Sequence, residues 1–101
     1  MGSFHLEIIT PDKPFFSEDI DRVIVKSSTG DLAVLKNRAP LFAILKAGKI
    51  RISNENKEIA AKIDSGYLNI NDDNNTTIVT NSAQWLSDPD ASDIPDMSGI
   101  N

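Results

Sequence analysis

The sequence predicts an all-β fold, a flattened antiparallel β-sandwich or barrel of about 8–10 short strands. Three observations lead to this prediction. Apolar and polar residues alternate over several short segments, as they do in strands with one buried face. Turn-forming residues separate these segments roughly every 8–12 residues, which is typical of antiparallel sandwiches. No segment before Trp85 shows a sustained helical period.

The first predicted strand covers residues 4–9, where apolar and polar residues alternate. The large apolar side chains on one of its faces are Phe4, Leu6 and Ile8. Two prolines within residues 10–14 end this strand, because proline has no backbone N–H to donate. An apolar pair, Phe15-Phe16, follows, and we expect Ser17-Glu18-Asp19 to open a turn. The alternation returns over residues 21–27, which we predict as the next strand.

The centre of the chain contains a turn, a strand, a loop and a second strand. Gly30 ends the turn of residues 27–30, since glycine takes a positive φ without steric cost. A short strand around Leu32 and Val34 follows. Pro40 then marks residues 36–40 as a loop, and the apolar residues 41–45 form the next predicted strand.

Turns and strands continue to alternate in the second half of the chain. A turn at residues 46–49 precedes Ile50-Arg51-Ile52, and a polar hairpin turn at residues 54–57 precedes a strand over residues 58–63. Residues 67–70 form another strand, with Tyr67 and Asn69 on the face opposite to Leu68 and Ile70. The residues 71–75, all Asn or Asp, are the clearest turn, and the β-branched residues 76–80 form the last predicted strand.

The length of 101 residues predicts one domain, which we place at residues 4–85. Residues 1–3 resemble a cloning remnant and are left out of the fold prediction. Residues 86–101 are rich in Pro, Ser and Asp, and we expect a flexible acidic tail there. Residues 1–85 hold all 10 Lys and Arg against 11 Asp and Glu, so the tail carries four of the five net negative charges. This nearly neutral body offers no electrostatic footprint for nucleic acid.

The composition also limits the location of the protein and the chemistry it performs. The absence of cysteine excludes a disulfide scaffold and thiolate metal sites. No apolar run approaches the roughly 18 residues that cross a bilayer, and the N-terminus shows no signal-peptide pattern. The sequence therefore predicts a soluble, cytosolic protein without direct membrane insertion.

No candidate for catalysis, metal binding or cofactor binding outweighs a simpler interpretation. His5 is the only histidine, and its place on the outer face of a strand favours a surface residue over a general base. Gly48-Lys49 lacks the first glycine and the Ser or Thr of a phosphate-binding loop. Asp72-Asp73-Asn74-Asn75 lacks the glycine and the closing glutamate of a calcium loop, which favours a solvated turn. We therefore predict a protein that is not an enzyme and has no cofactor.

The order of these motifs resembles the epsilon subunit of F-type ATP synthases. That family has a turn ending in Gly-Glu, an apolar strand, a loop ending in His-Ala-Pro-Leu, and a glycine turn before a strand close to Ile-Arg-Ile. Here Asp31 takes the acidic position, Arg38 takes the histidine position, and Ala39-Pro40-Leu41 matches the family. The resemblance extends from Phe4 to about Trp85 and implies a flattened β-sandwich, without the C-terminal helical domain of longer members.

The resemblance implies a non-catalytic rotor subunit of the central stalk, in a peripheral complex at the cytoplasmic face of the cell membrane. It would link the gamma subunit to the membrane c-ring and couple ion flow to ATP synthesis. The c-ring contact would involve Thr29, Gly30 and Asp31. The gamma contact would involve Thr10, Arg38, Ala39, Phe42 and Ala43. Two alternatives stay open at this point: Asp31 as a plain turn aspartate, and Phe42 as a core residue.

Departures from the family pattern refine these expectations. Lys36-Asn37 stands where the family often has Pro-Gly, which leaves the geometry of this loop open. The ATP-binding motif of some members aligns with residues 89–94, where Asp90 is kept and the arginine is missing, so we expect no nucleotide binding. Inhibition of ATP hydrolysis belongs to the family's C-terminal helices, and we expect none here. The alternative function is a free-standing β-sandwich binding module unrelated to ATP synthase.

Overall fold

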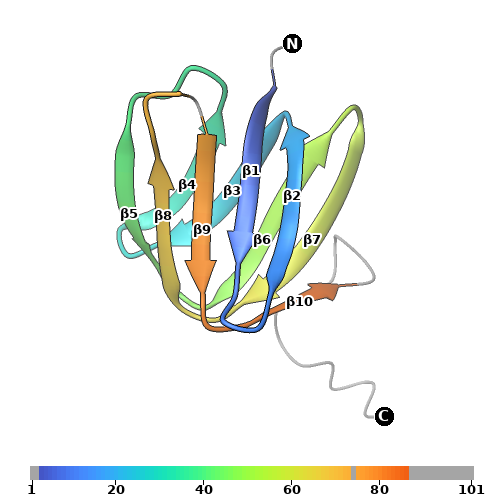
Figure 1. The fold of residues 1–101 in the computed structure, drawn as a ribbon, viewed down its shortest axis with the longest axis vertical. Helices are drawn as coiled ribbons and strands as arrows, with labels where there is room; N and C mark the ends of the chain where they lie inside the picture. The colour runs from blue at the N-terminus through green and yellow to red at the C-terminus, as the bar shows by residue number, and fades with distance from the viewer. Residues whose placement is uncertain (1–2, 74, 87–101) are drawn as a thin grey trace.

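The computed structural model describes residues 3–73 and 75–86, which form ten strands and no helix (Figure 1). The predicted tail, residues 86–101, lies outside the described residues except for Leu86. The strands are β1 (Phe4–Ile9), β2 (Pro14–Ile20), β3 (Arg22–Ser27), β4 (Gly30–Leu35), β5 (Leu41–Leu45), β6 (Gly48–Asn54), β7 (Lys57–Ile63), β8 (Gly66–Ile70), β9 (Asn75–Thr80) and β10 (Ala83–Leu86).

The ten strands form one continuous sheet that folds over into two layers. The strand order is β10-β7-β6-β3-β5-β8-β9-β1-β2, and β4 pairs with β3 beside this path. In Figure 1, β8, β9, β1 and β2 lie in front of β3, β4 and β6. Every pair is antiparallel except β1 and β9, which run parallel. The predicted all-β sandwich is confirmed, with one parallel pair that joins the first strand to the ninth.

The core lies between the two layers and follows the alternation of the sequence. Leu6 and Ile8 are fully buried, and Phe4 is nearly so, which confirms the predicted face of the first strand. The buried apolar residues that pack together are Phe4, Leu6, Ile8, Ile20, Val23, Val25, Val34, Leu45, Ile50, Ile52, Ala61, Ile63, Leu68, Ile70 and Ile78. They come from nine of the ten strands, so the core depends on pairings between distant parts of the chain.

Two strands differ from the prediction. Residues Ser17-Glu18-Asp19 continue β2 instead of opening a turn, with Glu18 opposite Leu6 and Asp19 opposite His5. This polar strand is stable because it pairs with β1 along its length and lies at the edge of the sheet, where exposed charges are common. The tenth strand, β10, was also not predicted.

Aromatic side chains close the seam where the two ends of the sheet meet. Strands β10 and β2 are the first and last in the sheet order. Trp85 of β10 stacks on Phe15 of β2 with ring centroids 4.5 Å apart, and its ring meets Phe16 edge-on at 5.7 Å. Such contacts stabilise the seam without a shared hydrogen-bond ladder.

The hydroxyl of Thr80 lies between the turn before β8 and the turn after β9, and its removal should lower the stability of the fold. Its Oγ1 lies 2.9 Å from the carbonyl oxygen of Asp64, 3.1 Å from that of Ser65 and 3.2 Å from that of Ser82, while the residue is buried. We expect Thr80→Val to lower the free energy of unfolding by about 1–2 kcal/mol in urea denaturation, because these carbonyl oxygens lose their side-chain donor. Thr77→Val, on the outward face of the same strand, should change it by less than about 0.5 kcal/mol.

Candidate functional site

The only histidine contacts a serine and an aspartate on the outer face of β1 and β2. Its Nδ1 lies 3.0 Å from Asp19 Oδ1, and its Nε2 lies 2.9 Å from Ser17 Oγ. A serine nucleophile needs a buried aspartate and donors for an oxyanion, whereas the Asp19 side chain is 72% exposed. We interpret the contact as a surface hydrogen-bond network. It was missed in the sequence because residues 17–19 resembled a turn.

No metal centre appears in the part of the chain that the structure describes. Within residues 3–73 and 75–86, no group of three or more His, Asp or Glu side chains is placed to hold a metal ion. The same residues contain no helix long and apolar enough to cross a membrane.

The turn between β3 and β4 presents the residues that the resemblance assigns to the c-ring. Gly30 has a φ of 129°, so the predicted positive φ is confirmed. The Oγ of Ser27 donates to the carbonyl oxygen of Gly30 at 2.6 Å and accepts from the backbone N–H of Thr29 at 3.3 Å. These bonds hold the turn rigid from within and leave Thr29, Gly30 and Asp31 exposed at its tip.

The carboxylate of Asp31 pairs with a lysine and not with a backbone N–H of its own turn. Its carboxylate lies 3.8 Å from Lys26 Nζ on the neighbouring strand, and its side chain is 73% exposed. An ion pair this open contributes little to stability. The carboxylate of Asp31 is therefore exposed to solvent at the tip of the turn.

A row of apolar side chains crosses the outer face of the front layer. In β5, β8, β9 and β1, register places Ile44 opposite Tyr67, Tyr67 opposite Val79, and Val79 opposite Ile9. Residues directly opposite each other share a face, so this row spans about 14 Å over three strand spacings. Phe42 adds to it, because its ring packs on that of Tyr67 with centroids 5.2 Å apart. We call Ile9, Phe42, Ile44, Tyr67 and Val79 the apolar patch.

The apolar patch is open and slightly concave. Phe42 is 58% exposed, Ile44 53% and Tyr67 39%. A shallow hollow of about 330 Å³ lies beside them, lined among others by Ile44, Tyr67 and Val79. Three large, exposed and contiguous apolar side chains indicate an interaction surface.

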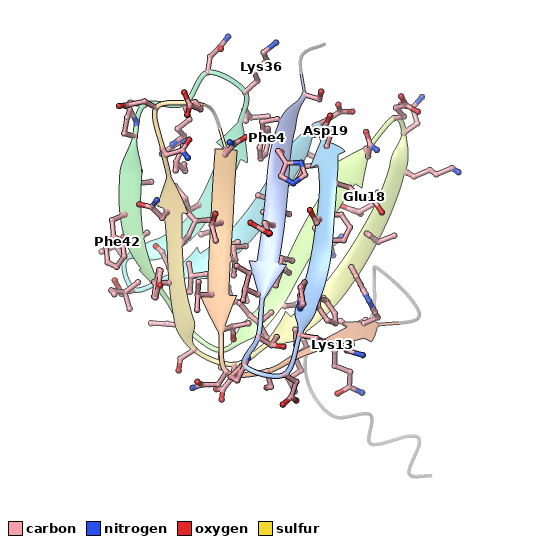
Figure 2. The ribbon with its side chains drawn as sticks, in the orientation of Figure 1. Phe4, Lys13, Glu18, Asp19, Lys36 and Phe42 are labelled. Carbon is pink, nitrogen blue, oxygen red and sulfur yellow. The ribbon has the colours of Figure 1, made fainter. Side chains whose placement is uncertain are left out.

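The structure separates the residues that the resemblance assigns to the gamma contact. Phe42 belongs to the apolar patch and is not a core residue, and Figure 2 shows its ring pointing away from the sandwich. Thr10 follows Ile9 and lies at the rim of the patch. Ala43 faces inward, opposite the buried Leu68. Arg38 and Ala39 lie exposed in the loop before β5, at the opposite end of this strand from Leu45.

The side chain of Arg38 is hydrogen-bonded to the strand that precedes its loop. Its Nη1 donates to the carbonyl oxygen of Ala33 on β4 at 3.0 Å. The hydrogen bond ties the loop of residues 36–40 to the strand before it. Lys36, in the same loop, lies at the upper end of the molecule in Figure 2, while Lys13, beyond Thr10, lies at the lower end.

The row from Ile44 to Ile9 also connects two of the assigned sites. At one end, the Ile44 carbonyl oxygen accepts from the backbone N–H of Ser28, in the turn that carries Thr29 and Gly30. At the other end, Ile9 is followed by Thr10. The patch thus lies between the assigned c-ring turn and one of the assigned gamma residues. The sequence did not reveal Ile9, Ile44, Tyr67 and Val79, although alternation with Phe42 was a signal for Ile44.

Comparisons with known proteins agree on the family. The model of the ATP synthase Delta/Epsilon chain beta-sandwich domain matches residues 3–86. The ATP synthase epsilon chain of Alkaliphilus oremlandii is 33% identical over 89 residues, which are 88% of this chain and 66% of the relative. That of Campylobacter curvus is 39% identical, over 86% of this chain and 67% of the relative. This chain therefore spans about two thirds of these relatives.

The solved structures show the same fold. A chain in the mitochondrial ATP synthase of Euglena gracilis, solved with OSCP, F1 and the c-ring, superposes with a TM-score of 0.83 at 19% identity, covering 99% of this chain and 60% of that one. A chain in the central stalk and c-ring of the Tetrahymena thermophila enzyme gives a TM-score of 0.70 at 16% identity, covering 81% of this chain and 66% of that one. The chain belongs to the ATP synthase Delta/Epsilon family, whose β-sandwich domain it matches over residues 3–86.

Proposed function

We propose that this chain is a non-catalytic rotor subunit of an F-type ATP synthase, or the sandwich part of one, that links the gamma subunit to the c-ring. The observation that carries the proposal is the apolar patch beside the turn of Thr29, Gly30 and Asp31. One face thus offers a broad apolar contact, and the adjoining tip offers a carboxylate. Family membership supports the assignment of these two surfaces to two partners.

The proposed mechanism is mechanical coupling. The patch binds gamma, and the exposed Asp31 contacts polar loops of the c-ring. A packed sandwich deforms little under load, so it holds the ring and the shaft in fixed register while ion flow turns them. The subunit works at the cytoplasmic face of the membrane without entering it, and it couples ion flow to synthesis without inhibiting ATP hydrolysis.

The test is direct binding to a gamma subunit from a related synthase. Size-exclusion chromatography with light scattering should show a one-to-one complex with folded gamma. The absence of a complex at about 10 μM of each protein, a concentration well above the Kd of a stable interface, would favour the alternative of a free-standing β-sandwich binding module.

We expect Arg38→Glu to weaken gamma binding by only about 3- to 10-fold. Arg38 precedes β5 at the end of this strand that is farther from Ile44 and Tyr67. Its guanidinium group already donates a hydrogen bond to the carbonyl oxygen of Ala33. Charge reversal at the rim of an interface acts modestly, mainly through the association rate. Titration calorimetry measures the effect, with Lys36→Glu in the same loop as the matched control. A loss of about 100-fold or more would move the centre of the interface to this loop.

A further inference from the structure

A hollow of about 670 Å³ lies where the start of β3, the end of β4 and the hairpin between β6 and β7 meet. Lys36, which lines it, is at the upper end of the molecule in Figure 2. Small-molecule sites typically measure about 300–1,000 Å³, so the hollow has the size of such a site. It shares no residue with the apolar patch or with the turn of Thr29, Gly30 and Asp31.

Strand register builds one side of the hollow from a single row of side chains. Leu35 of β4 lies opposite Arg22 of β3, and Arg22 lies opposite Ser53 of β6. Ser53 in turn lies opposite Glu58 of β7. Residues directly opposite each other share a face, and the alternate residue Val23 is buried. The row therefore crosses four strands on the outer side of this layer.

Three cations line the hollow, and none of them is neutralised by an ion pair. Within the described part of the chain, the ion pairs do not include Arg22, Lys36 or Lys57. The Nη2 of Arg22 lies 3.4 Å from the uncharged Oγ of Ser53. The rest of the guanidinium group is available to an anion, which arginine binds through parallel N–H donors.

Two carboxylates line the hollow as well, and only one of them keeps a net charge. Glu58 Oε1 lies 3.0 Å from Arg51 Nη1, so an ion pair neutralises it. Asp21 Oδ2 accepts a hydrogen bond from the backbone N–H of Glu55 at 2.9 Å and has no cationic partner among the described residues. Three cations against the carboxylate of Asp21 leave an excess of two positive charges. A phosphate monoester carries about two negative charges at neutral pH, which matches this excess.

The walls of the hollow are fixed by hydrogen bonds. The backbone N–H of Asp21 donates to the carbonyl oxygen of Ser53 at 2.9 Å, while its carboxylate holds the N–H of Glu55. The start of β3 therefore clamps the hairpin between β6 and β7. On the other side, the hydrogen bond from Arg38 Nη1 to β4 ties down the loop that begins with Lys36. A preformed site loses less conformational entropy when a ligand binds.

We propose that this hollow binds the phosphate group of a small molecule through Arg22, Lys36 and Lys57. The guanidinium fork of Arg22 donates to the phosphate oxygens, and the two lysines add their charges. Leu35, which is 52% exposed, offers an apolar contact to the body of the ligand. The inference goes beyond the proposed function and does not depend on it, because the hollow and the apolar patch lie on different layers.

A titration of the isotope-labelled full chain with inorganic pyrophosphate tests the proposal. In nuclear magnetic resonance spectra, without magnesium and at about 50 mM NaCl, we expect backbone amides of Lys36, Ser53 and Lys57 to shift with a Kd on the order of 1 mM or tighter. Amides of Tyr67 and Val79, on the other layer, should not move.

Charge variants connect the shifts to the three cations. The double variant Lys36→Gln with Lys57→Gln should weaken binding about 10-fold or more, because two positive charges are lost. Arg22→Lys keeps its charge and loses the fork, so we expect a weakening of about threefold. The matched control, Lys13→Gln with Lys46→Gln, lies outside the hollow and should stay within about twofold of the parent. The amide spectrum itself reports whether each variant stays folded.

Four results would overturn the proposal. Amides that do not shift at about 10 mM pyrophosphate would show that no phosphate binds. Equal shifts with NaCl of the same ionic strength would show a general salt effect. Unchanged affinity in the Lys36 and Lys57 double variant would place the anion elsewhere. Binding to vesicles of phosphatidic acid, without any shift from pyrophosphate, would indicate contact with a lipid surface and not a small-molecule site.

Discussion

Tyr67→Glu should weaken binding of the gamma subunit by about 100-fold or more. Tyr67 is central in the apolar patch, opposite Ile44 and Val79 and packed on Phe42 at 5.2 Å. A carboxylate at this position would lose its hydration when a partner covers the patch, which costs binding free energy. The substitution also removes an aromatic side chain, a type that often dominates the binding energy of an interface. Titration calorimetry or light scattering with purified gamma measures the loss.

The control for this prediction introduces the same charge on the other layer. Gln84 of β10 is exposed and points outward from the layer of β6 and β7, so Gln84→Glu should leave the affinity within about twofold. Tyr67 is itself exposed at the surface, so both variants should keep the thermal midpoint of the parent. If Tyr67→Glu bound gamma as well as the parent, the apolar patch would not be the docking surface.

Gly66→Ala should lower the free energy of unfolding by about 3 kcal/mol, equivalent to a fall in Tm on the order of 15 °C. A Cβ on Gly66 would overlap the carbonyl oxygen of Val79 and lie 2.9 Å from the Cα of Thr80. Both obstacles are backbone atoms of β9, so the methyl group forces β8 and β9 apart. Differential scanning calorimetry measures the shift.

The neighbouring residue provides the control. Ser65 is exposed in the turn before β8, so Ser65→Ala should change the free energy of unfolding by less than about 0.5 kcal/mol. Gly66 also lines the hollow beside Ile44 and Tyr67, so the alanine variant should bind gamma less tightly even when folded. A Gly66→Ala protein with the stability of the parent would mean that the two strands separate at little cost.

The fold class and most strands were readable from the sequence because their causes are local. Alternation with a period of two placed Phe4, Leu6 and Ile8 on one buried face, and the structure agrees. Gly30 at the β3–β4 turn was identified because few other residues tolerate its φ of 129°. The same turn placed Asp31 at an exposed tip, and the side chain is 73% exposed in the structure.

The candidate site was only partly readable, because a surface depends on which strands become neighbours. Phe42 was assigned to the gamma contact by resemblance, yet alternation alone did not say whether it was buried. Its partner Tyr67 lies on β8, and the row continues to Ile9 only because β1 pairs in parallel with β9. Register sets these contacts, and a shift of one residue would turn each side chain to the other face.

By itself, the sequence determined the strands whose alternation is local and most of the turns between them, including the one that ends at Gly30. The tertiary structure alone decided that residues 17–19 continue β2, that β10 exists, and that Trp85 closes the seam on Phe15 and Phe16. It also decided which side chains form the apolar patch. The physical reason is that strand stability and surface composition come from pairing with distant neighbours, whose identity no short segment encodes.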